Sequence, residues 1–146
     1  MRRTRLGILI SGGGSNLQAI IDACAQPDYP ADIRLVLSNK AGVFGLDRAA
    51  KAGIENAAIS HKAFPDRESF ERALTEKLEA ADVELVVLAG FMRILTPYFV
   101  EHWRDRLINI HPSLLPSFRG VDTHAQALKA GVKLHGCSVH FVRPGL

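Results

Sequence analysis

The sequence predicts an α/β fold, in which a single domain over residues 1–146 forms a doubly wound, mainly parallel sheet. Short apolar runs that are typical of buried strands alternate with segments whose apolar residues recur at helical spacing. A glycine-rich turn directly follows the first apolar run, and no repeat, linker or low-complexity segment interrupts the alternation. Since parallel strands end at one edge of such a sheet, we expect the ligand-binding loops at that edge.

Composition and charge are those of an ordinary globular domain. Hydrophobic residues make up 47% and charged residues 23% of the 146 residues. The 18 Lys and Arg against 15 Asp and Glu residues give a net charge of +3, and their interspersion argues against a nucleic acid partner. No stretch reaches the roughly 20 apolar residues of a membrane span, so we expect no membrane partner and a cytoplasmic location. Cys24 and Cys137 share no metal-like spacing and are expected to be free thiols.

Strands are expected at 6–10, 33–37, 54–59, 85–89, 107–110 and 136–142. The run 85–89 is entirely apolar, which is typical of a strand that is covered on both faces. The run 136–142 alternates and places Ser138 and His140 on one face.

Helices are expected between these strands, at 17–24, 45–52, 66–80, 97–103 and 121–130. Phe70, Leu74 and Leu78 are four residues apart and should form the buried stripe of the helix at 66–80. Gly53 suits a left-handed helix end, and Thr96 before Pro97 is typical of a helix start.

The glycine-rich turn, Gly12-Gly13-Gly14, predicts an anion site at the start of the first helix. Ser15 or Asn16 is expected to cap this helix, whose first N–H groups would face a phosphate. The dinucleotide fingerprint is not met, because Leu17 takes the place of its third glycine, and this favours a single phosphate. The alternative of a tight turn without any ligand stays open.

Asn109 and His111 follow an apolar run and lie on one face where the strand runs into a loop. An amide can donate a hydrogen bond to an oxygen that gains negative charge, and an imidazole can transfer a proton near neutral pH. This pair suits acyl transfer. Residues of these types before Pro112 also commonly do no more than end a strand, so both interpretations stay open.

Three motifs in this chain together resemble a known family. They are Ile10-Ser11-Gly12-Gly13-Gly14-Ser15-Asn16-Leu17-Gln18, Leu88-Ala89-Gly90-Phe91-Met92-Arg93-Ile94-Leu95 and Asn109-Ile110-His111-Pro112-Ser113-Leu114-Leu115-Pro116. In this order and spacing they resemble the phosphoribosylglycinamide formyltransferases of purine biosynthesis, within the 10-formyltetrahydrofolate-dependent formyltransferase family. The resemblance covers essentially the whole chain. The third motif alone is shared with methionyl-tRNA formyltransferase, whereas the first two point to the glycinamide ribonucleotide enzymes.

The resemblance implies transfer of a formyl group from 10-formyltetrahydrofolate, as co-substrate, to the amine of glycinamide ribonucleotide, without a metal. It implies that Asn109 and His111 are catalytic, with Ser138 and His140 flanking the site. It also implies two binding regions: Gly14, Ser15, Asn16 and Leu17 for the substrate phosphate, and Arg67, Met92, Arg93, Ile94, Leu95, Arg143, Pro144, Gly145 and Leu146 for the folate.

The carboxyl end departs from the pattern of the resembled family. There the strand continues into a segment with an aspartate that orients the catalytic histidine, whereas this sequence ends at Leu146, one position earlier. We therefore expect a fragment that lacks the C-terminal strands and helix of its domain. The alternatives are a formyltransferase for methionyl-tRNA or a sugar amine, and a non-catalytic phosphate-binding fragment.

Overall fold

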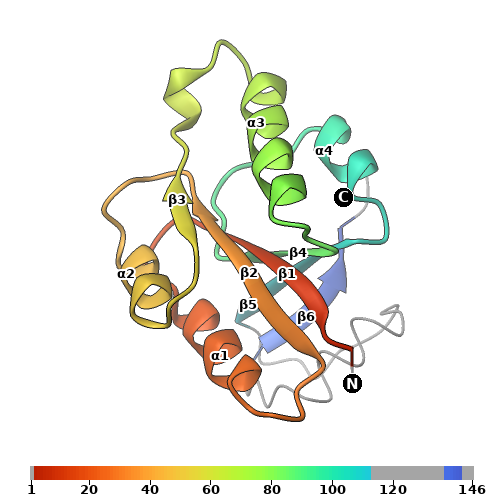
Figure 1. The fold of residues 1–146 in the computed structure, drawn as a ribbon. Coiled ribbons are helices and arrows are strands. Elements are labelled where there is room, and N and C mark those ends of the chain that lie inside the picture. Colours follow the sequence, from red (N-terminus) through yellow and green to blue (C-terminus); the bar gives the residue numbers. More distant parts are fainter. Residues whose placement is uncertain (1, 113–136, 143–146) are drawn as a thin grey trace.

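The computed structural model describes residues 2–112 and 137–142, and for 111, 112 and 137–140 it describes the strand pairing (Figure 1). The elements in chain order are β1 (Thr4–Ile10), α1 (Ser15–Cys24), β2 (Ala31–Ser38), α2 (Phe44–Lys51), β3 (Asn56–Ala58), the 3-10 helix η1 (His61–Ala63), α3 (Arg67–Ala80), β4 (Leu85–Ala89), α4 (Pro97–His102), β5 (Leu107–Pro112) and β6 (Cys137–Phe141). The expected helix at 121–130 lies outside the described residues.

The described strands form one sheet with the order β3-β2-β1-β4-β5-β6. The strands β1 to β5 pair in parallel, and β6 pairs antiparallel with β5. This confirms the predicted doubly wound, mainly parallel α/β fold. The strand β3 is shorter than expected, and β5 continues to Pro112, beyond the expected end at 110, so His111 lies within the strand. The strand β5 is longer than expected because His111 and Pro112 pair with β6.

Helices cover both faces of the sheet, because alternate strand residues point to opposite sides. On one face Ile8 and Ile10 of β1 pack in a cluster with residues of α1 and α2. On the other face Leu9 belongs to a cluster that includes Phe70, Leu74 and Leu78 of α3 and residues of α4. The stripe predicted for α3 is therefore confirmed as buried.

Helix ends confirm part of the predicted pattern. Asp66 caps α3 by accepting a hydrogen bond from the Ser69 N–H at 2.7 Å, and Gly53 follows α2 with a φ of 73°. Thr96 occupies the N-cap position of α4, but its side chain makes no cap bond there. Among the described helices none is both long and apolar enough to span a membrane.

The direction of chain winding changes between β1 and β4. From β1 the chain leads through α1 to β2 on one side, whereas β4 leads through α4 to β5 on the other. The loops that leave the carboxyl ends of these two neighbouring strands diverge, and ligands of open α/β sheets bind at such a point.

Candidate active site

One row of paired positions crosses the sheet toward the predicted catalytic residues. It runs from Leu37 through Leu9, Leu88 and Asn109 to His140. The three leucines are buried beneath α3 and α4, and half-buried Asn109 is the first polar residue of the row. Two residues further along their chains come Ser11, Gly90 and His111, at the carboxyl edge. With strands about 4.8 Å apart, these three positions lie within roughly 10 Å of one another.

The glycine turn, residues 12–14, leads from β1 directly into α1. Gly14 is the N-cap residue with a φ of 76°, and α1 has no side-chain cap bond, so the expected capping by Ser15 or Asn16 was wrong. A Cβ at Gly14 would lie 2.9 Å from the Gly45 Cα, so both the left-handed conformation and the close packing require glycine. Among the residues that the structure describes, none has an atom within 4 Å of a Cβ placed at Gly12 or Gly13.

Two contacts from α2 hold the glycine turn, and sequence reasoning missed both. The Gly45 N–H donates to the Gly12 carbonyl at 3.0 Å. The Arg48 guanidinium donates to the Gly13 carbonyl at 2.7 Å and to the Gln18 Oε1 at 3.1 Å, and it lies 4.6 Å from the centre of the Phe44 ring. An arginine one turn after the start of the next helix gave no separate signal in the sequence.

The β4–α4 loop, residues 90–96, contains the predicted folate-binding residues 92–95. Met92 and Ile94 are 76% and 74% exposed although both are large and apolar. The Met92 N–H donates to the Ser11 hydroxyl at 2.8 Å, and that hydroxyl donates to the Asn39 Oδ1 at 2.5 Å. Ser11 therefore joins the glycine turn, β2 and this loop.

The far end of the β4–α4 loop is held by a carboxylate. Glu71 on α3 is 1% exposed and accepts hydrogen bonds from the Thr96 N–H, at 2.7 Å, and from the Thr96 hydroxyl. Burial raises the pKa of Glu71, while the bonds from Thr96 oppose that rise. The sequence contained a signal, because Glu71 and Thr75 lie on the inner side of α3 next to its apolar stripe.

Positive charge gathers beside this edge. Arg67 is exposed in the first turn of α3, one turn before Glu71. The pKa of His61 is lowered by burial and, in decreasing order, by the positive charges of Arg93, Lys62 and Lys40. The predicted folate residue Arg93 thus lies within electrostatic reach of η1.

The remaining predicted site residues fall at the edge of the described chain. In the pairing of β5 with β6, Asn109 lies opposite His140 and His111 lies opposite Ser138, so these four positions share one face. Arg143, Pro144, Gly145 and Leu146 lie outside the described residues. Among the residues whose side chains the structure describes, 2–110, 141 and 142, no group of three or more His, Cys, Asp or Glu residues could hold a metal ion.

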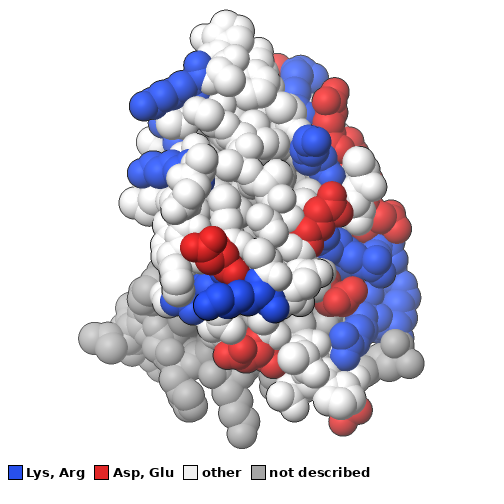
Figure 2. Space-filling view, turned by 60° about the vertical axis from the view of Figure 1, so that its left-hand side comes forward, with Lys and Arg blue, Asp and Glu red and all other residues white. Residues whose placement is uncertain are grey.

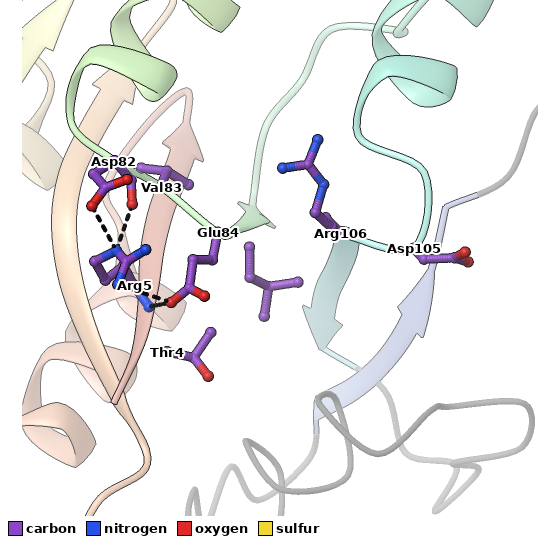
Figure 3. Close-up of a pocket in the computed structure, with 8 residues that line it drawn as sticks. Thr4, Arg5, Asp82, Val83, Glu84, Asp105 and Arg106 are labelled. Carbon is purple, nitrogen blue, oxygen red and sulfur yellow. Dashed lines mark hydrogen bonds and ion pairs between the residues drawn. The ribbon is translucent and has the colours of Figure 1, made fainter. Parts of the chain in front are cut away.

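A cavity of about 510 Å³ lies at the opposite, amino edge of the sheet (Figure 3). Its charged groups largely bind each other: the Arg5 guanidinium contacts Asp82 at 3.2 Å and Glu84 at 3.5 Å. None of the predicted site residues that the structure describes lines it. In Figure 2, acidic and basic side chains lie next to one another mainly along the right-hand side of the view, while the centre of this face is largely uncharged.

The fold and this edge are those of a known class, and the chain belongs to the formyl transferase family. The family model described as "Formyl transferase" matches residues 4–146.

Within this family, the chain is similar to proteins with names from purine biosynthesis. Phosphoribosylglycinamide formyltransferase of Escherichia coli (strain K12) is 54% identical over 135 residues, which are 92% of this chain and 64% of that protein. Trifunctional purine biosynthetic protein adenosine-3 of Homo sapiens is 51% identical over 141 residues, which are 97% of this chain and 14% of that protein. The crystal structure of glycinamide ribonucleotide transformylase 1 from Symbiobacterium toebii matches with a TM-score of 0.80 and 45% identity, covering 99% of this chain and 68% of that one.

The chain is therefore similar to one part of its curated relatives. It spans slightly less than two thirds of the E. coli protein and between 11% and 14% of the trifunctional proteins named here, those of Drosophila pseudoobscura pseudoobscura and Homo sapiens.

Proposed function

We propose that this chain is the formyltransferase domain of an enzyme that transfers a formyl group from 10-formyltetrahydrofolate to the amine of 5′-phosphoribosylglycinamide, in purine biosynthesis. The observation that carries the proposal is the common edge of the glycine turn, the β4–α4 loop and Asn109, in a chain of the formyl transferase family. Both substrates are small molecules, and the proposed location is the cytoplasm.

The proposed reaction begins with attack of the substrate amine on the formyl carbon. A new carbon–nitrogen bond forms and the formyl oxygen becomes an oxyanion, to which the Asn109 amide donates a hydrogen bond. His111 donates to the same oxygen or carries the proton from the amine to N10 of the folate, as the bond between N10 and the formyl carbon breaks. No metal takes part in this scheme.

Binding is assigned to the two loops beside the catalytic pair. Backbone N–H groups at residues 14–17 hold the substrate phosphate, since the start of a helix favours an anion. Met92, Arg93, Ile94, Leu95 and Arg67 contact the folate, and residues 143–146 complete that side. Ser138 and His140 flank the reacting groups.

The test is a formyl-transfer assay of the full-length protein with phosphoribosylglycinamide. We expect turnover, and we expect Asn109→Ala and His111→Ala each to lower kcat by about 10²–10³, which is typical for loss of one oxyanion donor. His102→Ala on α4 is the matched control, because His102 pairs with Glu79 at 3.2 Å away from the site. Activity only with another amine, or full turnover of both site variants, would refute the proposal.

A further inference from the structure

The β4–α4 loop is fixed at both ends by buried side chains from other elements. We propose that Glu71 is a positioning residue for the folate co-substrate: through Thr96 it holds the far end of this loop in the shape that receives the ligand, while Ser11 holds the near end. The inference rests on the proposed function and assigns a role to a residue outside the family motifs.

The near end is held at the junction of three strands. Ser11 is 5% exposed, and its hydroxyl accepts from the Met92 N–H at 2.8 Å while it donates to Asn39 at 2.5 Å. Gly90, with a φ of 76°, turns the chain just before this bond. Because Ser11 also precedes the glycine turn, a change there would reach both ligand loops.

At the far end, Glu71 on α3 binds Thr96. Its carboxylate is almost fully buried, and within the described part of the chain no Lys, Arg or His nitrogen lies within 4.0 Å of it. Desolvating a carboxylate without a cation is costly, and two hydrogen bonds to Thr96 are its compensation. A neutral apolar residue would fill this place on α3 at lower cost, so the carboxylate is explained by what it holds.

The residues between the two anchors explain why anchoring matters. Met92 and Ile94 present large apolar side chains to solvent, which an unrestrained loop would turn inward. A loop that is ordered before binding loses less conformational entropy when the ligand arrives. The anchors therefore maintain an exposed apolar surface for the flat ring system of a folate.

The experiment compares Glu71→Leu, Glu71→Gln and the exposed control Glu76→Leu in the full-length protein. We expect Glu71→Leu to raise the Kd for tetrahydrofolate, the folate product, and the KM for 10-formyltetrahydrofolate about tenfold, in line with loss of hydrogen bonds to a buried charged group. The KM for phosphoribosylglycinamide should stay within about twofold. Glu71→Gln should restore most of the affinity, because its amide can accept from the Thr96 N–H and donate to the Thr96 hydroxyl.

Hydrogen exchange separates this role from a general loss of stability. In Glu71→Leu the Thr96 amide should lose protection while the amides of β4 keep theirs. In Ser11→Ala the Met92 amide should lose protection, and the KM values of both substrates should rise. Unchanged tetrahydrofolate binding in a folded Glu71→Leu protein, or equal weakening of both substrates, would overturn the inference. Failure of the proposed function would be recognised separately, because the unmodified protein itself would then show no formyl transfer.

Discussion

The glycine turn and the β4–α4 loop leave neighbouring strands at the same edge, and each contains a glycine with a φ of 76°. The two glycines differ in what surrounds them. A Cβ at Gly14 would meet the backbone of Gly45 at 2.9 Å, whereas a Cβ at Gly90 would meet no atom of the described residues within 4 Å. The glycine turn is held by close backbone packing against Gly45 together with the Arg48 side chain, whereas the buried polar side chains of Ser11 and Glu71 hold the β4–α4 loop. The same left-handed glycine conformation thus occurs in two loops with different restraints. This difference is consistent with the proposed functions of the two loops, a phosphate site with close backbone approach and a folate site with exposed side chains.

The largest expected difference between the two loops should appear when each glycine is replaced by alanine. Gly14→Ala should lower the free energy of unfolding by about 3 kcal/mol, because a left-handed alanine costs about 1–2 kcal/mol and the contact with Gly45 adds to it. Gly90→Ala should cost only about 1 kcal/mol, since the conformational term acts alone. Urea unfolding of the full-length protein measures both, and equal losses would contradict the difference in restraint.

Removing the side chain that holds the glycine turn should have a smaller effect. Arg48→Met deletes two hydrogen bonds and the stacking on Phe44, so we expect a loss of about 1 kcal/mol in stability and a rise of about fivefold in the KM for phosphoribosylglycinamide. Arg34→Met is the control, because Arg34 pairs with Asp32 on the exposed surface. An increase in the KM for the folate instead would assign Arg48 to the other loop.

The polar anchor of the β4–α4 loop should leave a signature in pH dependence. The pKa of Glu71 is raised in the folded protein, chiefly by burial, with Glu68 adding to the rise and Arg67 opposing it. The folded state therefore holds its proton more tightly than the unfolded state. The contribution of Glu71 to stability is fully present below about pH 4.5 and is lost as the pH rises through the folded pKa. Relative to Glu71→Gln, the unmodified protein should lose stability from pH 4 to 7 in urea unfolding, and a parallel pH profile would contradict this.

The smallest effect is expected at the other end of α1, which the glycine turn begins. Burial raises the pKa of the Cys24 thiol to about 12, with Asp32 adding to the rise. At pH 8 the thiolate is then roughly one part in ten thousand, and alkylation by iodoacetamide should be very slow until urea is added. Rapid native labelling of Cys24 would show that α1 is less firmly packed than the turn before it.

The fold was predictable because the apolar runs of the strands carry local signals. The run 85–89 coincides with β4, and Asp66 and Gly53 mark helix ends through their own chemistry. The antiparallel direction of β6 was not predictable, since it depends on a partner strand and not on its own pattern.

The motifs of the candidate site could be predicted from the sequence, but the side-chain contacts that hold its loops could not. The three candidate ligand segments could be placed because each lies at a strand end. The contacts of Ser11 with Met92 and of Glu71 with Thr96 join residues 81 and 25 positions apart, and no local pattern reports them. The expectation that Ser15 caps α1 was wrong for the same reason, since a contact distant in sequence decides the helix start. The close approach of Gly14 and Gly45 is a tertiary contact that decides how the chain enters α1, and no local preference reports it.

We propose above that the glycine turn and Asn109 bind the same substrate molecule at the carboxyl edge of the sheet. Titration of phosphoribosylglycinamide into isotopically labelled full-length protein tests it through the NMR signals of the backbone amides at 15–17 and of the Asn109 side-chain amide. We expect both sets of signals to shift together with the same Kd, and inorganic phosphate to shift only those of residues 15–17. Shifts at the turn with none at Asn109 would contradict it.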